Sequence, residues 1–212
     1  MTVRRARGVA EASHVFSTVV IENMRRAPKY RRNQGGKLRM STHDRLILAM
    51  LAGIYKKLGI RDDINPDLVL ASVFGDKEWG LRWEYGSLYE DRQLPQPPEV
   101  NETTVILDMY RFLTASYGRL SAPEKAKVDA SPHGSYVKFQ GFDGNNDLHY
   151  GIMHYLVEDL GRYGEHKPTG VLNSHSMGTI MRYRRMVPIM NRHDSHVRGS
   201  LTADQIIEVL NG

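Results

Sequence analysis

The sequence contains no cysteine. The chain therefore has no disulfide, no thiolate metal site and no cysteine nucleophile. It also lacks a run of ~20 apolar residues of the kind that crosses a bilayer. Its arginine-bearing N-terminus has no apolar block followed by a small-residue cleavage site, so a secretory signal is not indicated. A chain without cysteine needs no disulfide and suits a reducing compartment. Together with the lack of a membrane-spanning run and of a secretory signal, this predicts a cytoplasmic protein.

The composition is that of an ordinary globular protein, with 212 residues, 41% hydrophobic and 25% charged. This length and balance predict one domain, or one domain with a short appendage. The charge is unevenly distributed. Residues 1–40 hold ten Lys and Arg against two acidic residues, a net +8, and since the whole chain carries +5, the remaining 172 residues carry −3. We interpret residues 1–40 as a basic N-terminal extension, with a short helix before Pro28 and a solvated linker after it.

Residues 41–212 carry the start signals of successive helices. Ser41 and Asn65 are typical N-caps, and Pro66 suits a first helical position. Two further starts are indicated, one at Ser121, which is followed by Pro123 and Glu124, and one at Thr202, which forms a capping box with Gln205. No repeat, heptad array or βαβ alternation is visible. The sequence therefore predicts an all-α, multihelical domain over residues 41–212.

Apolar residues recur at helical spacing, and we expect these stripes to face the core. The clearest stripes are Leu46, Ile47, Met50, Leu51 and Ile54, then Val105, Met109, Phe112, Leu113 and Tyr117, and then Leu148, Ile152, Tyr155, Leu156 and Leu160. An aromatic series, Trp79, Trp83, Tyr85 and Tyr89, predicts core or a subunit interface. Residues 94–98 are rich in proline, and mark either a boundary between subdomains or a stiff loop.

Several segments, in shared order and spacing, resemble the YfbU family of small bacterial proteins. They are Asp44-Arg45-Leu46-Ile47-Leu48, Phe139-Gln140-Gly141-Phe142-Asp143, Gly161-Arg162-Tyr163, Asn173-Ser174, Tyr183-Arg184-Arg185-Met186 and Leu201-Thr202-Ala203-Asp204-Gln205-Ile206-Ile207. The resemblance covers residues 41–212. It implies an all-helical, cytosolic and self-associating protein, and it supplies no reaction or catalytic residues. Family members begin near Met40. Residues 1–39 are therefore either a native basic extension of this chain or an upstream segment that a mis-set start adds before Met40.

Residues 174–178, Ser-His-Ser-Met-Gly, are similar to the lipase nucleophile elbow Gly-x-Ser-x-Gly, with Ser176 in the nucleophile position. The elbow requires a strand of a parallel sheet before the serine. Residues 169–173 are too few and too polar for such a strand, and Ser174 replaces the first glycine. We therefore interpret the segment as a polar loop that caps the next helix. The alternative is a hydrolase with a site near Ser176, completed by His175, His154 and Glu158.

Two patterns raise the possibility of metal binding. Asp143 to Asp147 carries oxygens at alternate positions, but an EF-hand needs glycine at its sixth position and glutamate at its twelfth, where this chain has Leu148 and His154. An Asx turn at a helix start is the better interpretation. Seven histidines lie in the segment from His133 to His196, but their spacing matches no zinc-binding signature. The remaining metal hypothesis is a pocket formed by His154, Glu158 and His175. No metal or cofactor is predicted.

A basic cluster follows near the C-terminus. It comprises Arg182, Arg184, Arg185, Arg192 and Arg198, interleaved with Tyr183. Positive charge at close spacing attracts phosphates, and aromatic rings stack on bases. The predicted nucleic-acid contacts are Arg25, Arg26, Arg31, Arg32, Arg182, Arg184 and Arg185. No helix-turn-helix, zinc-finger or RNA-binding signature accompanies them.

Three functions follow from the sequence. The first is a non-enzymatic helical protein that forms a homo-oligomer and acts through a macromolecular partner. The second is a nucleic-acid-associated regulator that uses the basic extension and residues 182–198. The third is the hydrolase near Ser176. No membrane association is predicted, and the sequence leaves open whether the chain binds a small-molecule ligand.

Overall fold

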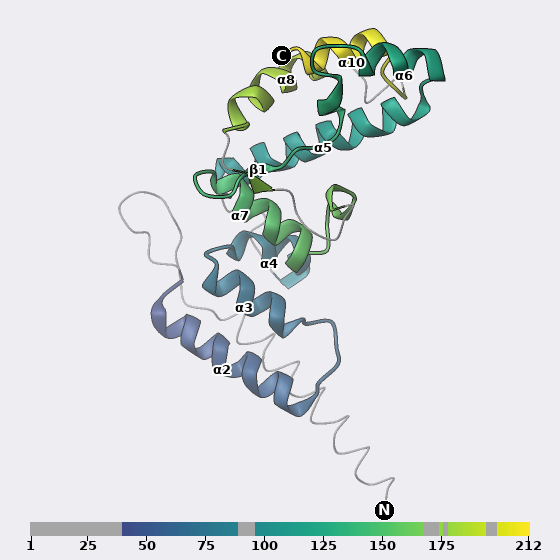
Figure 1. The fold of residues 1–212 in the computed structure, drawn as a ribbon. Coiled ribbons are helices and arrows are strands. Elements are labelled where there is room, and N and C mark those ends of the chain that lie inside the picture. Colours follow the sequence, from purple (N-terminus) through teal and green to yellow (C-terminus); the bar gives the residue numbers. More distant parts are fainter. Residues whose placement is uncertain (1–39, 89–95, 168–173, 176–177, 194–198) are drawn as a thin grey trace, which may run out of the picture. The chain divides into compact units, whose positions relative to one another are not determined.

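The computed structural model describes residues 40–88, 96–167, 174–175, 178–193 and 199–212. Almost every element in this part of the chain is a helix (Figure 1). The all-α prediction is therefore confirmed. None of the described helices is long and apolar enough to cross a membrane.

The chain divides into two compact units, Met1–Pro95 and Gln96–Gly212. The division falls within the proline-rich stretch at residues 94–98 that the sequence marks as a break. Residues 1–39 of the predicted basic extension, residues 1–40, lie outside the described residues, so its expected helix and linker stay predictions.

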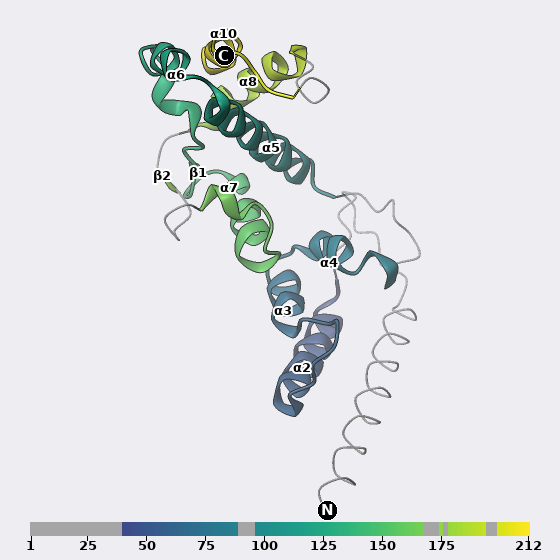
Figure 2. The same cartoon turned by 90° about the vertical axis from the view of Figure 1, so that its right-hand side faces the viewer.

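The first unit consists of α2 (Thr42–Leu58), α3 (Pro66–Phe74), α4 (Glu78–Glu84) and the short 3₁₀ turn η1 (Gly86–Leu88). The predicted caps hold, because Ser41 accepts a hydrogen bond from the Asp44 amide and Asn65 accepts from the first amides of α3. α2 lies against α3, as both views of the ribbon show (Figure 1 and Figure 2).

The core of this unit contains a different face of α2 from the one that the sequence predicts. Ala52 and Tyr55 are buried, whereas Leu46, Ile47, Met50 and Ile54 are exposed. The expectation that this stripe is buried is wrong. Periodicity shows that a helix has an apolar face, but it does not show what covers that face. The remaining core comes from α3 and α4, with Leu68, Val69, Val73, Trp79 and Leu81.

The second unit is built around one long helix. Its elements are α5 (Pro98–Arg119), α6 (Ala122–Asp129), η2 (Gly134–Val137), β1 (Phe142–Asp143), α7 (Leu148–His154), the π-helix η3 (Tyr155–Asp159), η4 (Gly164–His166), β2 (Ser174–His175), α8 (Ile180–Arg192) and α10 (Ala203–Leu210). The N-terminal half of α5 packs against α7, and α8 and α10 lie along the same helix (Figure 1).

Local sequence signals explain where these helices begin. The capping box predicted at Thr202 is present, and the helix start predicted at Ser121 also carries one, with Gln205 and Glu124 reaching back to the capping amides. Each box satisfies two amide donors that the first turn of a helix leaves without partners. Pro188 lies inside α8.

The predicted core of the second unit is confirmed in part. Met109, Leu113, Ile152, Tyr155 and Leu156 are buried. Val105 is 37% exposed and Leu148 is 70% exposed, so the expectation that they are buried is wrong. Leu148 is the first residue of α7, where the turn that precedes the helix leaves its side chain in solvent.

β1 and β2 form the one pairing of strands among the described residues. It is parallel, and joins Phe142 with Ser174 and Asp143 with His175. Two residues from each strand do not make the central parallel sheet that a nucleophile elbow requires. Ser176 itself lies outside the described residues.

Candidate functional site

The segment Phe139–Asp143, the most distinctive in the family resemblance, forms part of an aromatic centre in the second unit. Tyr110, Phe139, Phe142 and Tyr183 are all buried, and their rings contact one another at centroid distances between 5.2 and 5.9 Å. Gly141 has φ 99°, a conformation that favours glycine. Its carbonyl accepts hydrogen bonds from the Tyr183 hydroxyl at 2.8 Å and the Thr179 hydroxyl at 3.2 Å. The segment thus ties the start of α8 to the core.

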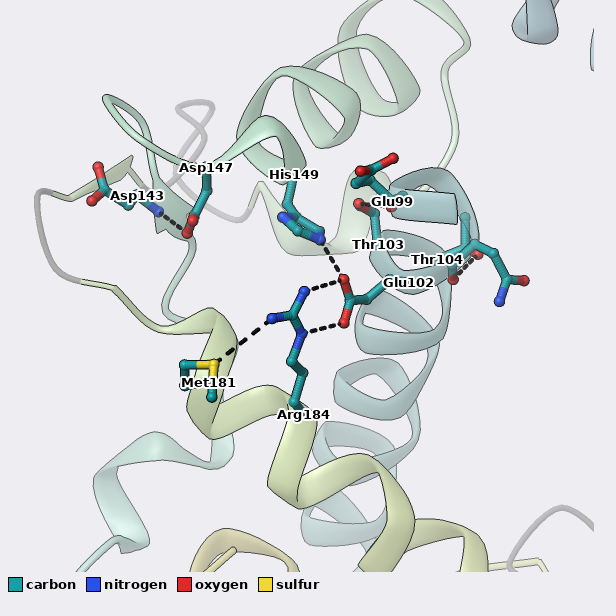
Figure 3. A network of polar contacts seen from close by, with 10 residues as sticks. Glu99, Glu102, Thr103, Thr104, Asp143, Asp147, His149, Met181 and Arg184 are labelled. Atoms are coloured by element: carbon teal, nitrogen blue, oxygen red, sulfur yellow. Dashed lines mark hydrogen bonds and ion pairs between the residues drawn. The ribbon is translucent and has the colours of Figure 1, made fainter. Parts of the chain in front are cut away.

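Three side chains from three helices meet beside this centre (Figure 3). Glu102 from α5 receives two hydrogen bonds from Arg184 of α8, one from Nε at 2.6 Å and one from Nη2 at 2.9 Å. His149 of α7 places Nε2 2.8 Å from the same carboxylate. The sequence placed Arg184 in the basic cluster. It gave no signal that residues 82 positions apart would pair.

The charge on Glu102 is strongly stabilised. Its pKa is lowered from an ordinary 4.5 to about 2, mainly by the hydrogen bond from Arg184, with a further contribution from His149, while partial burial acts in the opposite direction. A bidentate guanidinium–carboxylate pair holds both planar groups in one orientation. The carboxylate therefore stays ionised at neutral pH and joins α5 to α8.

His149 completes the connection to α7. The residue is 5% exposed, and its ring lies 5.5 Å from that of Phe142. Because the ionised carboxylate can only accept, Nε2 of His149 donates its proton to Glu102, and Nδ1 has no hydrogen-bond partner among the described residues. With its carboxylate bound by Arg184 and by His149, this group links three helices.

The predicted nucleic-acid residues divide into two groups. Arg25, Arg26, Arg31 and Arg32 lie outside the described residues, as does Arg198. The arginines of α8 each contact another residue of the chain. Arg182 places its guanidinium carbon 3.9 Å from the centre of the Tyr136 ring, Arg184 binds Glu102, and Arg185 donates from Nε to the Gly212 carbonyl. Arg192 pairs with Glu208 at 3.2 Å. These contacts partly compensate the positive charge that the sequence shows in this helix.

Other candidates for metal or acid–base chemistry are accounted for locally. Asp143 is 4% exposed and accepts the amides of Asn145 and Asn146, so the predicted Asx turn is confirmed. Burial lowers the pKa of His166, whose Nε2 lies 2.9 Å from the Leu107 carbonyl. His154 is exposed, and Glu158 pairs with Lys167 at 2.6 Å. Within the described part of the chain, no three His, Asp or Glu residues are grouped to hold a metal ion.

The first unit presents a different kind of candidate, an exposed apolar face of α2. We use "α2 face" for the side chains of Leu46, Ile47, Met50, Ile54 and Leu58, which are between 43% and 61% exposed. The opposite side of the helix carries the buried Ala52 and Tyr55. A single exposed leucine is ordinary, but five large apolar side chains on one helix face are typical of an interaction surface.

The comparisons with known proteins agree with the resemblance seen in the sequence. The family model of the YfbU domain matches residues 38–212. No curated protein and no solved structure matched the chain. A match over this length, together with the helical fold, establishes that the chain belongs to the YfbU family.

Proposed function

We propose that the chain is a non-catalytic helical protein that self-associates and acts through a macromolecular partner. The observation that carries this proposal is the α2 face. α2 buries one side against α3 and leaves five large apolar side chains in water on the other side. A second surface that covers these side chains lowers the free energy of the system. In self-association, the apolar face of another copy of the protein is this second surface.

The size of the α2 face sets the expected strength of the association. Five side chains at these exposures present on the order of 500 Å² of apolar surface, near the upper range for the largest patch on a monomer. Two copies together would bury about 1,000 Å², the lower end for a specific interface. We therefore expect an association that depends visibly on concentration.

The non-catalytic part of the proposal rests on the second unit. Its most strongly perturbed carboxylate, Glu102, is fully engaged with Arg184 and His149. The Tyr183–Met186 segment is similarly occupied, because the Tyr183 hydroxyl binds Gly141 and Met186 lies 3.9 Å from the Tyr110 hydroxyl. Residues of the family resemblance thus have structural contacts, which favours a scaffold over an enzyme.

Met50→Glu is expected to weaken self-association by about tenfold or more, because a charge placed in the middle of the α2 face loses its hydration when the face is covered. The measurement is size-exclusion chromatography with light scattering over a wide range of protein concentration. Met181→Glu is the matched control, since Met181 is 59% exposed in the other unit and Met50 is 61% exposed. The control is expected to associate like the parent chain. A parent chain that stays monomeric at high concentration would contradict the proposal.

A nucleic-acid role is the second candidate, favoured by the ten basic against two acidic residues in residues 1–40. It predicts retention of DNA or RNA that weakens steeply with salt, and weaker retention after removal of residues 1–39. Arg182→Gln, Arg184→Gln and Arg185→Gln test the contribution of α8. A full chain that retains no nucleic acid at ~50 mM salt would remove this candidate.

A further inference from the structure

Three of the five side chains of the α2 face are placed symmetrically about Met50. Met50 has Leu46 four residues before it and Ile54 four residues after it, and all three are exposed. Residues four apart lie on the same side of a helix, about 6 Å apart along its axis. A second copy that runs in the opposite direction, related by a two-fold axis through Met50, would therefore place Leu46 against Ile54 twice and Met50 against Met50.

The charges at the two ends of α2 select the direction of this pairing. The first turn contains Asp44, and the last turn contains Lys56 and Lys57. An antiparallel pair brings the acidic first turn of one helix beside the basic last turn of the other, and it also aligns the helix dipoles favourably. A parallel pair would instead place the lysines of both copies together.

The edge of the α2 face permits a close approach. Gly53 is exposed, and a Cβ added there would meet no atom within 4 Å. A glycine beside Ile54 leaves room for the side chain of Leu46 of the partner, which faces Ile54 in this pairing. Lys56 also pairs with Asp67 of the same chain, at 2.5 Å, so Lys57 is the last-turn cation on which the contact with the acidic first turn of the partner depends.

We propose that two copies of this chain pair through an antiparallel contact of their α2 helices, with the two-fold axis at Met50. The inference rests on the proposed self-association and adds its surface, direction and register. The contact is isologous, so the same patch serves both copies and the assembly closes at this interface as a dimer.

The absence of cysteine allows the register to be tested with single cysteines introduced into the full chain. Met50→Cys is expected to cross-link with itself under mild oxidation, because the two-fold axis brings equivalent residues within disulfide range. Leu58→Cys is the matched control on the same face. Eight residues from the axis, its two copies would lie roughly 24 Å apart along the helices, so cross-linking is expected to be at least about tenfold slower. A mixture of Leu46→Cys and Ile54→Cys proteins is expected to cross-link to each other.

The outcomes separate this inference from the proposed function. Rapid self-cross-linking of Leu58→Cys would show a parallel pair and overturn the antiparallel register. A parent chain that associates in light scattering while none of the α2 cysteines cross-links would leave self-association standing and remove the α2 contact. A monomeric parent chain whose α2 cysteines become accessible only after unfolding would show that the same chain covers this face, and both ideas would fail.

Discussion

Glu102→Gln is expected to lower the free energy of unfolding by about 2 kcal/mol at neutral pH, with the loss concentrated in the Gln96–Gly212 unit. The substitution keeps the shape of the side chain but removes the charge that Arg184 binds in bidentate geometry. It also deprives the buried His149 of its charged acceptor. Hydrogen bonds to charged groups contribute ~1.5–3 kcal/mol each, and solvent around the exposed side of Arg184 reduces the total.

The same interaction predicts a dependence on pH. Because the pKa of Glu102 is about 2 in the folded chain and near 4.5 without its partners, the stabilisation is fully present above about pH 4.5. It is lost as the pH falls from 4.5 towards 2, where the folded carboxylate takes up a proton. Glu102→Gln is expected to remove this part of the acid-induced loss of stability, so the two unfolding profiles approach each other at low pH.

The measurement is denaturant unfolding at a series of pH values, with amide hydrogen exchange to assign the change to one unit. Glu99→Gln is the matched control, since Glu99 lies one turn earlier on α5, and its expected effect is within ~0.5 kcal/mol. The two tryptophans, Trp79 and Trp83, belong to the first unit, so their fluorescence reports on the unit that is not changed. A Glu102→Gln profile parallel to that of the parent chain between pH 4.5 and 2 would contradict this account of the ion pair.

The helices and several of their starts were predictable because the signals for them are local. The boxes at Ser121 and Thr202, and the Asn65–Pro66 start, each involve residues within one turn of each other. The helix that the stripe from Val105 to Tyr117 predicts is observed as α5, Pro98–Arg119. Such features depend on hydrogen bonds that neighbouring residues alone can form.

The partners of each helix were not predictable in the same way. The stripe that contains Met50 is as regular as that of a buried helix, yet Tyr55 on the other side is the residue that packs inside. Likewise, Glu102 looks like a solvated residue until the fold brings Arg184 to it across 82 positions of sequence. A single sequence contains the periodicity of a helix but not the identity of what lies against it. Both the candidate interface and the link between three helices are therefore products of tertiary structure.

Gly134→Ala is expected to destabilise the second unit by about 3 kcal/mol, because the backbone leaves no room for a methyl group at this position. Gly134 begins η2 directly after α6 and is buried. A Cβ there would lie 2.9 Å from the Asp129 Cα, and closer still to the Val128 carbonyl oxygen. Neither atom belongs to a flexible side chain, so the end of α6 would have to move. Val128 is fully buried, and that movement would also disturb the core.

Gly118→Ala is the matched control for this prediction. Gly118 lies in the last turn of α5 in the same unit, and a Cβ there would meet no atom within 4 Å. Replacing a helical glycine by alanine reduces the conformational entropy of the unfolded chain, so this variant is expected to be more stable by ~0.5–1 kcal/mol. The same substitution therefore has opposite signs at two positions, and denaturant unfolding followed by circular dichroism measures both. A close approach of backbone to backbone at Gly134 cannot accept a methyl group without a costly movement. Equal stability of the Gly134→Ala variant and the parent chain would therefore contradict this close approach in the turn after α6.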